Sequence, residues 1–182
     1  MSLVPPEAEV VEAGEVVLAP FRPADIARLA EAFADPEIAR WNPGAVDEAG
    51  VSAWVERRND WSDGVHASWG VFSRGGDLVG SVSLHRIDAD QLDAEIGYFV
   101  VPSDRGRGYA TRAVQAATRY AFGRLSLHRV YLFHAVTNIV SCRVATSAGF
   151  RLEGELRLSF RYADGDYHDE HLHAILADEL PR

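Results

Sequence analysis

Residues 94–122 read AEIGYFVVPSDRGRGYATRAVQAATRYAF, and this stretch decides the fold expected for the chain. It opens with an expected strand, residues 94–101, which contains the apolar run Ile96 to Val101 and has apolar residues on both faces, as is typical at the centre of a sheet. A loop containing Gly106 and Gly108 then leads into a segment with the spacing of a helix. Glycine permits a tight turn, and a helix start presents unpaired N–H groups at the positive end of its dipole. The junction therefore predicts a site for an anion.

The segments around this junction predict a mixed α/β architecture. A strand, loop, helix, strand order ending at residues 129–136 implies a right-handed parallel crossover. Hairpins on either side imply antiparallel neighbours. We expect one domain over residues 1–182, with residues 1–14 forming a loose N-terminal tail. The other expected strands are residues 16–22, 67–72, 78–87, 150–162 and 167–176, and the other expected helices run from Pro23 to Asp35, from Asp47 onward, and over residues 140–147.

Composition limits the classes of function. The chain has 182 residues, of which 47% are hydrophobic and 25% charged, as in ordinary globular domains. No apolar stretch approaches the roughly 20 residues that cross a bilayer, so we expect a cytoplasmic protein without a membrane partner. The formal net charge of −9 argues against a nucleic-acid partner and is compatible with a cationic one. A single cysteine, Cys142, excludes an internal disulfide and a cysteine-rich metal centre.

The glycine loop does not match the common nucleotide fingerprints. A dinucleotide-binding loop needs a third glycine after Gly106 and Gly108, and a Walker A loop needs Gly-Lys followed by Ser or Thr; neither is present. A pyrophosphate held by successive amides from Gly106 to Thr111 remains. The side chains of Arg105, Arg107 and Arg112 are available to add positive charge.

Several motifs together give the chain a resemblance to a known family. The loop contains R-x-x-G-x-A at Arg105, Gly108 and Ala110, and N-x-x-S follows at Asn138 and Ser141. With the opening L-x-P-F-R-P-A-D and the closing hairpin, these motifs make nearly the whole chain resemble the GNAT superfamily of N-acetyltransferases. Within it, the chain is most similar to the branch of the RimJ and RimL ribosomal-protein N-terminal acetyltransferases.

The resemblance implies the GNAT fold and an acetyl-CoA site within it. The fold is a mixed, mostly antiparallel sheet of about seven strands, flanked by helices and splayed between two central parallel strands, here residues 94–101 and 129–136. Separated strands lose each other's backbone hydrogen bonds, so a pantetheine arm can take their place. The expected cofactor-binding residues are Phe99, Val100 and Val101 for the pantetheine and thioester, Arg105, Gly106, Arg107, Gly108, Tyr109, Ala110 and Thr111 for the pyrophosphate, and Asn138 and Ser141 for the pantetheine arm and the sulfur.

Direct attack by an amine on a thioester needs a proton acceptor and a proton donor. Glu95 is the expected base, because it shares a strand face with Gly97 and Phe99 and the family often has an acidic residue near the acceptor amine; an ion-paired surface role is the alternative. The resemblance makes Ser141 the acid, with Tyr131 or a water as substitutes. Asn138 is also suited to cap a helix. Trp41, His85 and His134 are expected to line the acceptor pocket together with Glu95.

Two other chemistries are disfavoured. Cys142 has no neighbouring base implied by the sequence, so burial is favoured over a role as nucleophile. His171 and His173 alternate on one strand face, but two histidines on a hairpin do not complete a metal site. We therefore expect no metal.

The predicted function is transfer of the acetyl group of acetyl-CoA to a primary amine, first of all a protein N-terminus, in a ternary complex. A polyamine or aminoglycoside as acceptor and a larger donor such as succinyl-CoA remain open alternatives. A non-catalytic acyl-CoA-binding regulatory module is an alternative of another class. A homodimer is compatible with the resemblance.

Overall fold

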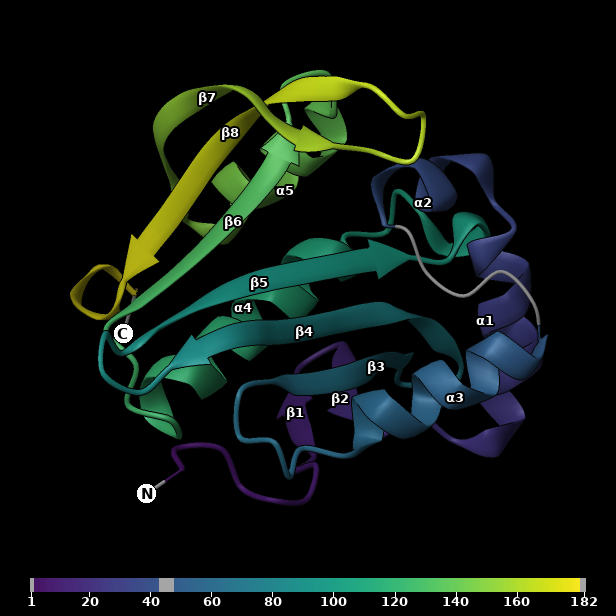
Figure 1. The fold of residues 1–182 in the computed structure, drawn as a ribbon. Helices are drawn as coiled ribbons and strands as arrows, with labels where there is room; N and C mark the ends of the chain where they lie inside the picture. Colours follow the sequence, from purple (N-terminus) through teal and green to yellow (C-terminus); the bar gives the residue numbers. More distant parts are fainter. Residues whose placement is uncertain (1, 43–47, 181–182) are drawn as a thin grey trace.

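The computed structural model describes residues 2–42 and 48–180, and its strands form one sheet in the order β1-β2-β3-β4-β5-β6-β8-β7 (Figure 1). The strands are β1 Val11–Ala13, β2 Val16–Ala19, β3 Ala67–Ser73, β4 Leu78–Asp88, β5 Asp93–Val100, β6 Arg129–Ala135, β7 Arg151–Arg161 and β8 Tyr167–Leu176. The α-helices are α1 Ile26–Phe33, α2 Pro36–Trp41, α3 Glu48–Asn59, α4 Tyr109–Gly123 and α5 Ile139–Ala148. Short 3-10 turns lie at Pro23–Asp25, Pro102–Asp104 and Ala177–Glu179.

The sheet is splayed at its one parallel pair. β5 and β6 are paired only from Asp93 to Glu95 and from Arg129 to Tyr131, and beyond this short register they diverge (Figure 1). The other neighbouring strands are antiparallel, and β6 stays paired with β8 along its whole length. The predicted mixed sheet, splayed between two central parallel strands, is confirmed, with eight strands in place of about seven.

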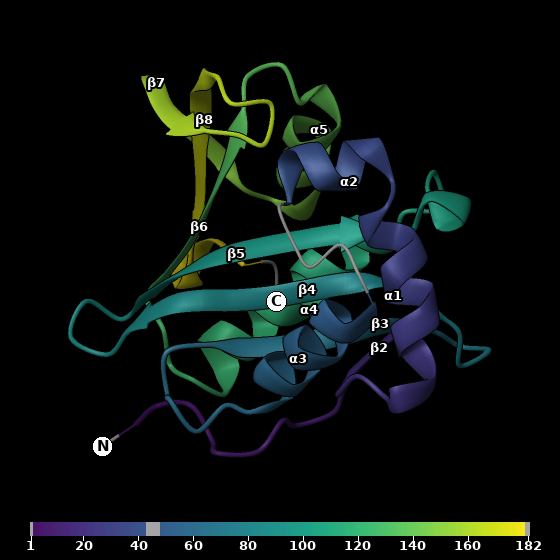
Figure 2. The same ribbon diagram turned by 45° about the vertical axis from the view of Figure 1, so that its right-hand side comes forward.

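Helices cover both faces of the sheet, with α4 on one side and α1 and α3 on the other (Figure 2). The small residues Ala113, Ala117 and Ala121 of α4 are buried against the strands, as their spacing predicted. On the opposite face, Phe33 and Trp54 pack edge to face with ring centroids 5.2 Å apart. Each fully buried large apolar side chain contributes about 1.5–3 kcal/mol, so both layers hold β5 firmly in the middle.

The prediction that residues 1–14 form a loose tail is wrong. β1 pairs with β2, and the Trp69 indole N–H donates to the Glu9 carbonyl at 2.7 Å. The Glu9 carboxylate accepts hydrogen bonds from the Tyr120 hydroxyl at 2.7 Å and from the Arg124 guanidinium. The contacts of Glu9 with Tyr120 and Arg124 span more than a hundred positions of sequence, and the contact with Trp69 spans 60. The local sequence pattern of the segment therefore did not predict them.

Two expected boundaries also differ. Asp35-Pro36 was read as the end of a helix, but it begins α2, since the Asp35 carboxylate accepts from the Ile38 amide at 3.0 Å and proline occupies the first turn. Trp41 is therefore the last residue of a helix and does not lie in a loop. The strand expected over residues 16–22 ends at Ala19. The helix start expected at Asp47 lies outside the described residues.

Among the described residues, no helix combines the length and the apolar character that crossing a bilayer requires.

Candidate active site

A cavity of about 560 Å³ opens where β5 and β6 separate. This volume lies within the range of about 300–1,000 Å³ that small-molecule sites occupy. Its walls come from the second half of β5, the glycine loop, β6 and α5, and α2 closes one end. The predicted cofactor-binding residues that line it are Phe99, Val100, Arg105, Gly106, Gly108, Tyr109, Ala110, Thr111, Asn138 and Ser141.

The glycine loop presents backbone N–H groups at one end of this cavity. Gly106 and Gly108 have φ of 78° and 76°, a left-handed conformation that strains other residues. Gly108 is the N-cap of α4, so the amides of Tyr109, Ala110 and Thr111 fall in the first turn and have no acceptor within the helix. The local structure is the expected anion cradle, and the dipole of a 15-residue helix points its positive end at it.

The arginines of the loop are bound to protein groups. Arg105 donates to the Asp35 carboxylate at 2.6 Å, and Arg107 donates to that of Asp104 at 3.2 Å. Arg112 donates to the carbonyl oxygen of Arg107 at 2.7 Å. In this structure these side chains brace the loop, and Arg107 is not among the residues that line the cavity. Charge for an anion therefore comes first from the backbone of the loop.

Asn138 and Ser141 lie at the start of α5, facing the same cavity. The Asn138 side-chain oxygen accepts from the Ser141 amide at 3.1 Å, so this residue is the helix N-cap. The Ser141 hydroxyl is 2.8 Å from the Tyr98 hydroxyl. Burial raises the pKa of Tyr98 to about 12, although the hydrogen bond to Ser141 opposes the rise. The pair therefore holds two protonated hydroxyls in contact.

Tyr98 is a site residue that the sequence analysis missed. In the sequence it stands in a mostly apolar strand, and no motif marks it. Alternation along the strand could have found it, because Tyr98 must point to the face opposite Glu95 and Gly97, the face on which α5 lies. Tyr131, named as a substitute acid, pairs with Glu95 where β5 and β6 are still joined and lines neither of the two cavities described here.

A second cavity of about 510 Å³ lies on the other face of the sheet. It contains Glu95, His85 and Trp41, three of the four residues expected at the acceptor pocket. The His85 Nε2 atom is 3.2 Å from one Glu95 carboxylate oxygen, and Arg86 donates to the other at 3.0 Å. Burial, the largest influence, raises the pKa of Glu95, but His85 and Arg86 together bring it below its ordinary value. Glu95 is therefore an anion at neutral pH.

A second carboxylate lies in this cavity and was not predicted. Glu170 is buried, and its two oxygens accept from the Tyr162 hydroxyl at 2.8 Å and the Ser159 hydroxyl at 2.9 Å. Ser159 lies in β7, and Tyr162 lies in the turn between β7 and β8. The cavity combines the carboxylates of Glu95 and Glu170 with the aromatic walls of Trp41, Trp54 and Tyr162, and Arg58 and Arg86 also line it. Arg86 is paired with Glu95, whereas Glu170 has hydroxyl partners and can attract a cation.

The two cavities share a wall at the gap between the strands. The residues that line both are Trp41, Asn42, Ile96, Gly97, Tyr98, Phe99, Phe133 and Tyr162. A group held in one cavity can therefore meet a group held in the other at the point where β5 leaves β6. This arrangement suits a transfer reaction between two bound molecules.

Two predicted residues are placed differently. The Val101 amide donates to the Val79 carbonyl at 2.9 Å, and its side chain is buried in the core, so it is not free to meet a ligand. His134 lines the first cavity and not the acceptor-like one, and its Nδ1 atom is bonded to the Ala135 carbonyl. The reason is register: His134 pairs with His171 on β8, which turns it toward α5.

Comparison with known proteins agrees with this geometry. The model of the "Acetyltransferase (GNAT) domain" family matches residues 15–151. The chain is 32% identical over 166 residues to the "Putative ribosomal N-acetyltransferase YdaF" of Bacillus subtilis, covering 86% of this chain and 88% of that protein. It is 34% identical over 92 residues to the spermidine N(1)-acetyltransferase of Vibrio cholerae, a match that covers 50% of this chain and 53% of that protein. Among solved structures, Mycobacterium smegmatis RimJ in complex with CoA-disulfide matches with a TM-score of 0.85 and 25% identity, covering 99% of this chain and 91% of that chain.

Proposed function

Because the chain belongs to the GNAT acetyltransferase family, we propose that it moves the acetyl group of acetyl-CoA to a primary amine, first of all a protein N-terminus. The observation that carries the proposal is the pair of cavities that meet between β5 and β6. One has a cradle of free amides, and the other has two carboxylates among aromatic rings.

The donor side is the cavity with the glycine loop. The pyrophosphate of the donor would accept hydrogen bonds from the amides of residues 106–111, and its pantetheine arm would lie along Phe99 and Val100. Asn138 and Ser141 then stand at the far end of the arm. The solved structure of Mycobacterium smegmatis RimJ is a complex with CoA-disulfide, and its fold matches this one over almost the whole chain, which supports this assignment.

The acceptor side is the cavity with Glu95 and Glu170. Two carboxylates suit an ammonium group, and the rings of Trp41 and Trp54 suit the rest of a cationic acceptor. A protein N-terminus is favoured by the similarity to the ribosomal N-acetyltransferase of Bacillus subtilis. The second carboxylate and the spermidine acetyltransferase relative favour one further candidate, a polyamine.

The reaction follows from the residues at the gap. Acetyl-CoA supplies a thioester whose carbonyl carbon is open to attack by a neutral amine. Glu95, with His85 against it, accepts the proton that the amine loses as the new C–N bond forms. Ser141 donates a proton to the sulfur as the C–S bond breaks, and Tyr98 replaces that proton through their 2.8 Å contact. A backbone amide of β5 stabilises the oxyanion, an effect worth about 2.7–4 kcal/mol in comparable sites.

The test measures release of CoA thiol from acetyl-CoA with two acceptors, a peptide with a free N-terminus and spermidine. We expect turnover with the peptide, with spermidine as the second candidate. Gly108→Glu should abolish donor binding in calorimetry, because it puts a negative side chain into the cradle and strains a left-handed backbone position. The matched control is Gly123→Glu at the far end of α4, where an added Cβ meets nothing within 4 Å.

The outcomes separate the alternatives. If the protein binds acetyl-CoA but releases no thiol with any amine, it is a regulatory acyl-CoA-binding module and not the enzyme proposed here. If the Gly108→Glu variant binds acetyl-CoA as tightly as the unaltered protein, the assignment of the donor cavity is wrong.

A further inference from the structure

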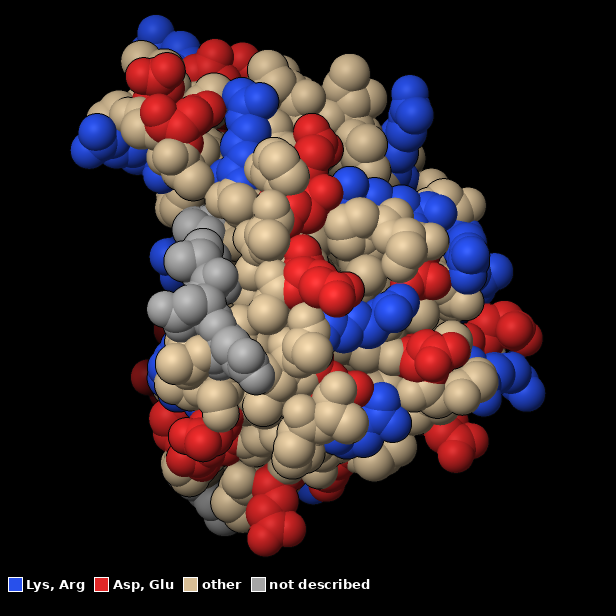
Figure 3. All heavy atoms as spheres, turned by 90° about the vertical axis from the view of Figure 1, so that its right-hand side faces the viewer, with Lys and Arg blue, Asp and Glu red and all other residues tan. Residues whose placement is uncertain are grey.

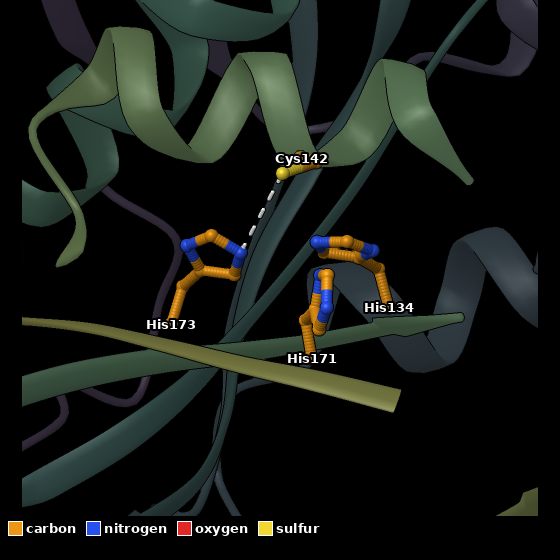
Figure 4. Close-up of side chains that lie close together, drawn as sticks. All are labelled: His134, Cys142, His171 and His173. Carbon is orange, nitrogen blue, oxygen red and sulfur yellow. Dashed lines mark hydrogen bonds between the residues drawn. The ribbon is translucent and has the colours of Figure 1, made fainter. Parts of the chain in front are cut away.

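Three histidines and the single cysteine converge between α5 and the sheet. His134 comes from β6, His171 and His173 from β8, and Cys142 from α5, and all four side chains point into one space (Figure 4). One ligand atom from each lies within 4.8 Å of those of the others. His134 and His173 are 3% and 2% exposed, so the space is buried in the molecule.

The register of two strands explains the convergence. β6 and β8 pair antiparallel with His134 opposite His171, and His173 lies two residues farther along the same face. His171 and His173 alone do not complete a metal site, and for that reason the sequence predicts no metal. Strand pairing adds His134, and packing of α5 adds Cys142.

The hydrogen bonds leave lone pairs without partners. The His134 Nδ1 atom bonds to the Ala135 carbonyl at 2.8 Å, so this nitrogen carries the proton and Nε2 carries a lone pair. His134 Nε2 and His171 Nδ1 are buried without a hydrogen-bond partner, and His173 turns its Nε2 atom toward the Cys142 sulfur. An unsatisfied buried polar atom costs about 1–3 kcal/mol, so two in one cluster need an explanation.

We propose that His134, Cys142, His171 and His173 bind one Zn²⁺ ion. Imidazole nitrogen and thiolate sulfur are the ligands that zinc prefers, and four protein ligands fill a tetrahedral shell, which is typical of structural sites. Zn–N distances of about 2.1 Å and a Zn–S distance of about 2.3 Å place tetrahedral ligand atoms roughly 3.3–3.6 Å apart. The Cys142 sulfur is already 3.9 Å from His173 Nε2, so small side-chain rotations suffice.

The surroundings suit a metal. Outer hydrogen bonds orient ligating histidines in known sites, and here the Ala135 carbonyl holds His134 while the Glu155 carboxylate lies 3.5 Å from His171 Nε2. Binding would release the proton of the Cys142 thiol.

The ion would join α5 to two strands. Cys142 directly follows Ser141, so zinc would fix the helix that carries the proposed proton donor. Its role is that of a positioning element, because none of the four ligands needs to touch the reacting atoms.

The experiment strips the full-length protein with a chelator and titrates it with Zn²⁺ alone, with no donor or acceptor present. We expect one zinc per chain and a rise in Tm. Co²⁺ used as a spectroscopic probe should give the intense visible bands of a tetrahedral site together with a thiolate-to-cobalt charge-transfer band.

Matched variants make the result decisive. Cys142→Ser, a near-isosteric change, should remove the charge-transfer band and weaken zinc binding by at least about 100-fold, beyond the effect of losing an outer hydrogen bond. His134→Ala should do the same to zinc affinity. His128→Ala, at an exposed histidine outside the cluster, should leave both unchanged.

Two results would overturn the proposal. One is less than one tightly bound zinc per chain in the unaltered protein. The other is a Cys142→Ser variant, folded by circular dichroism, that keeps the zinc affinity of the unaltered protein.

Discussion

Glu95 and Tyr98 lie three residues apart on β5, and this odd spacing sends their side chains to opposite faces of the sheet. Glu95 faces the cavity with two carboxylates, and Tyr98 faces the cavity with the amide cradle. Glu95 and Ser141 could be named from the sequence, because their motifs carry chemistry. Tyr98 could not be named from the sequence, because its hydroxyl gains a function only through Ser141, 43 positions away. That contact exists only because α5 packs against the sheet.

At the scale of single residues, Ser141→Ala should lower kcat by about 10²-fold or more with little change in KM for the donor, because it removes the proton donor. Tyr98→Phe should also lower kcat. Since the pKa of Tyr98 is about 12, its phenol stays protonated through neutral and moderately alkaline pH. We therefore expect no basic limb from this group when kcat is followed between about pH 7 and pH 10.

Glu95→Gln should lower kcat/KM for the acceptor by about 10²-fold and leave donor affinity unchanged. The pKa of Glu95 lies below its ordinary value, so its carboxylate is charged at neutral pH and loses that charge only as the pH falls through the lowered pKa. The defect should therefore persist across neutral and mildly acidic pH. Glu12→Gln, at an exposed residue of β1, is the control, and equal kinetics for the two variants would remove Glu95 from the reaction.

At the scale of elements, the strands and helices whose hydrophobic pattern is strong were predictable, including β5, α4 and the β7–β8 hairpin. β1 and α2 were not. β1 owes its place to contacts of the Glu9 backbone and side chain with Trp69 and α4, and Asp35-Pro36 signals a helix end and a helix start equally well in sequence. The pairing of His134 with His171 was equally hidden, because register between distant strands is a tertiary property.

Glu9→Gln tests how firmly the N-terminal segment is attached. Arg124 and then Tyr120 lower the pKa of Glu9, so its stabilising contribution is present above its ordinary pKa and is lost as the pH falls through the lowered one. Glu9→Gln replaces a charged acceptor of the Tyr120 hydrogen bond by a neutral one, which should lower the free energy of unfolding by about 1 kcal/mol. For a chain of this size, this corresponds to a fall in Tm of about 2–4 °C. Thermal unfolding should show this difference at pH 7 and should no longer show it at an acidic pH below the lowered pKa of Glu9. An equal difference at both pH values would show that the Glu9 charge is not responsible.

At the scale of the whole molecule, one sheet separates two chemical environments, and they share a wall where β5 leaves β6. The acidic groups proposed to attract the acceptor lie inside a cavity. On the face that carries α1, side chains of both signs are interspersed (Figure 3). Selection of a cationic acceptor therefore depends on Glu95, Glu170 and the aromatic walls more than on a broad surface field.

The Asp35–Arg105 contact has a consequence for the kinetic mechanism. Asp35 caps α2 and also holds Arg105 of the glycine loop at 2.6 Å, while Trp41, at the other end of α2, lines both cavities. Binding of acetyl-CoA at the glycine loop therefore acts, through Arg105, Asp35 and α2, on Trp41 in the wall of the acceptor cavity. This link favours a compulsory order of binding in which acetyl-CoA binds first. In steady-state assays, an unreactive acceptor analogue should be uncompetitive against acetyl-CoA, and a noncompetitive pattern would indicate random addition. Asp35→Asn keeps the helix cap but weakens the contact with Arg105, so the variant should bind its substrates in a less strict order. The six-residue helix α2 would then set the order in which the two substrates bind.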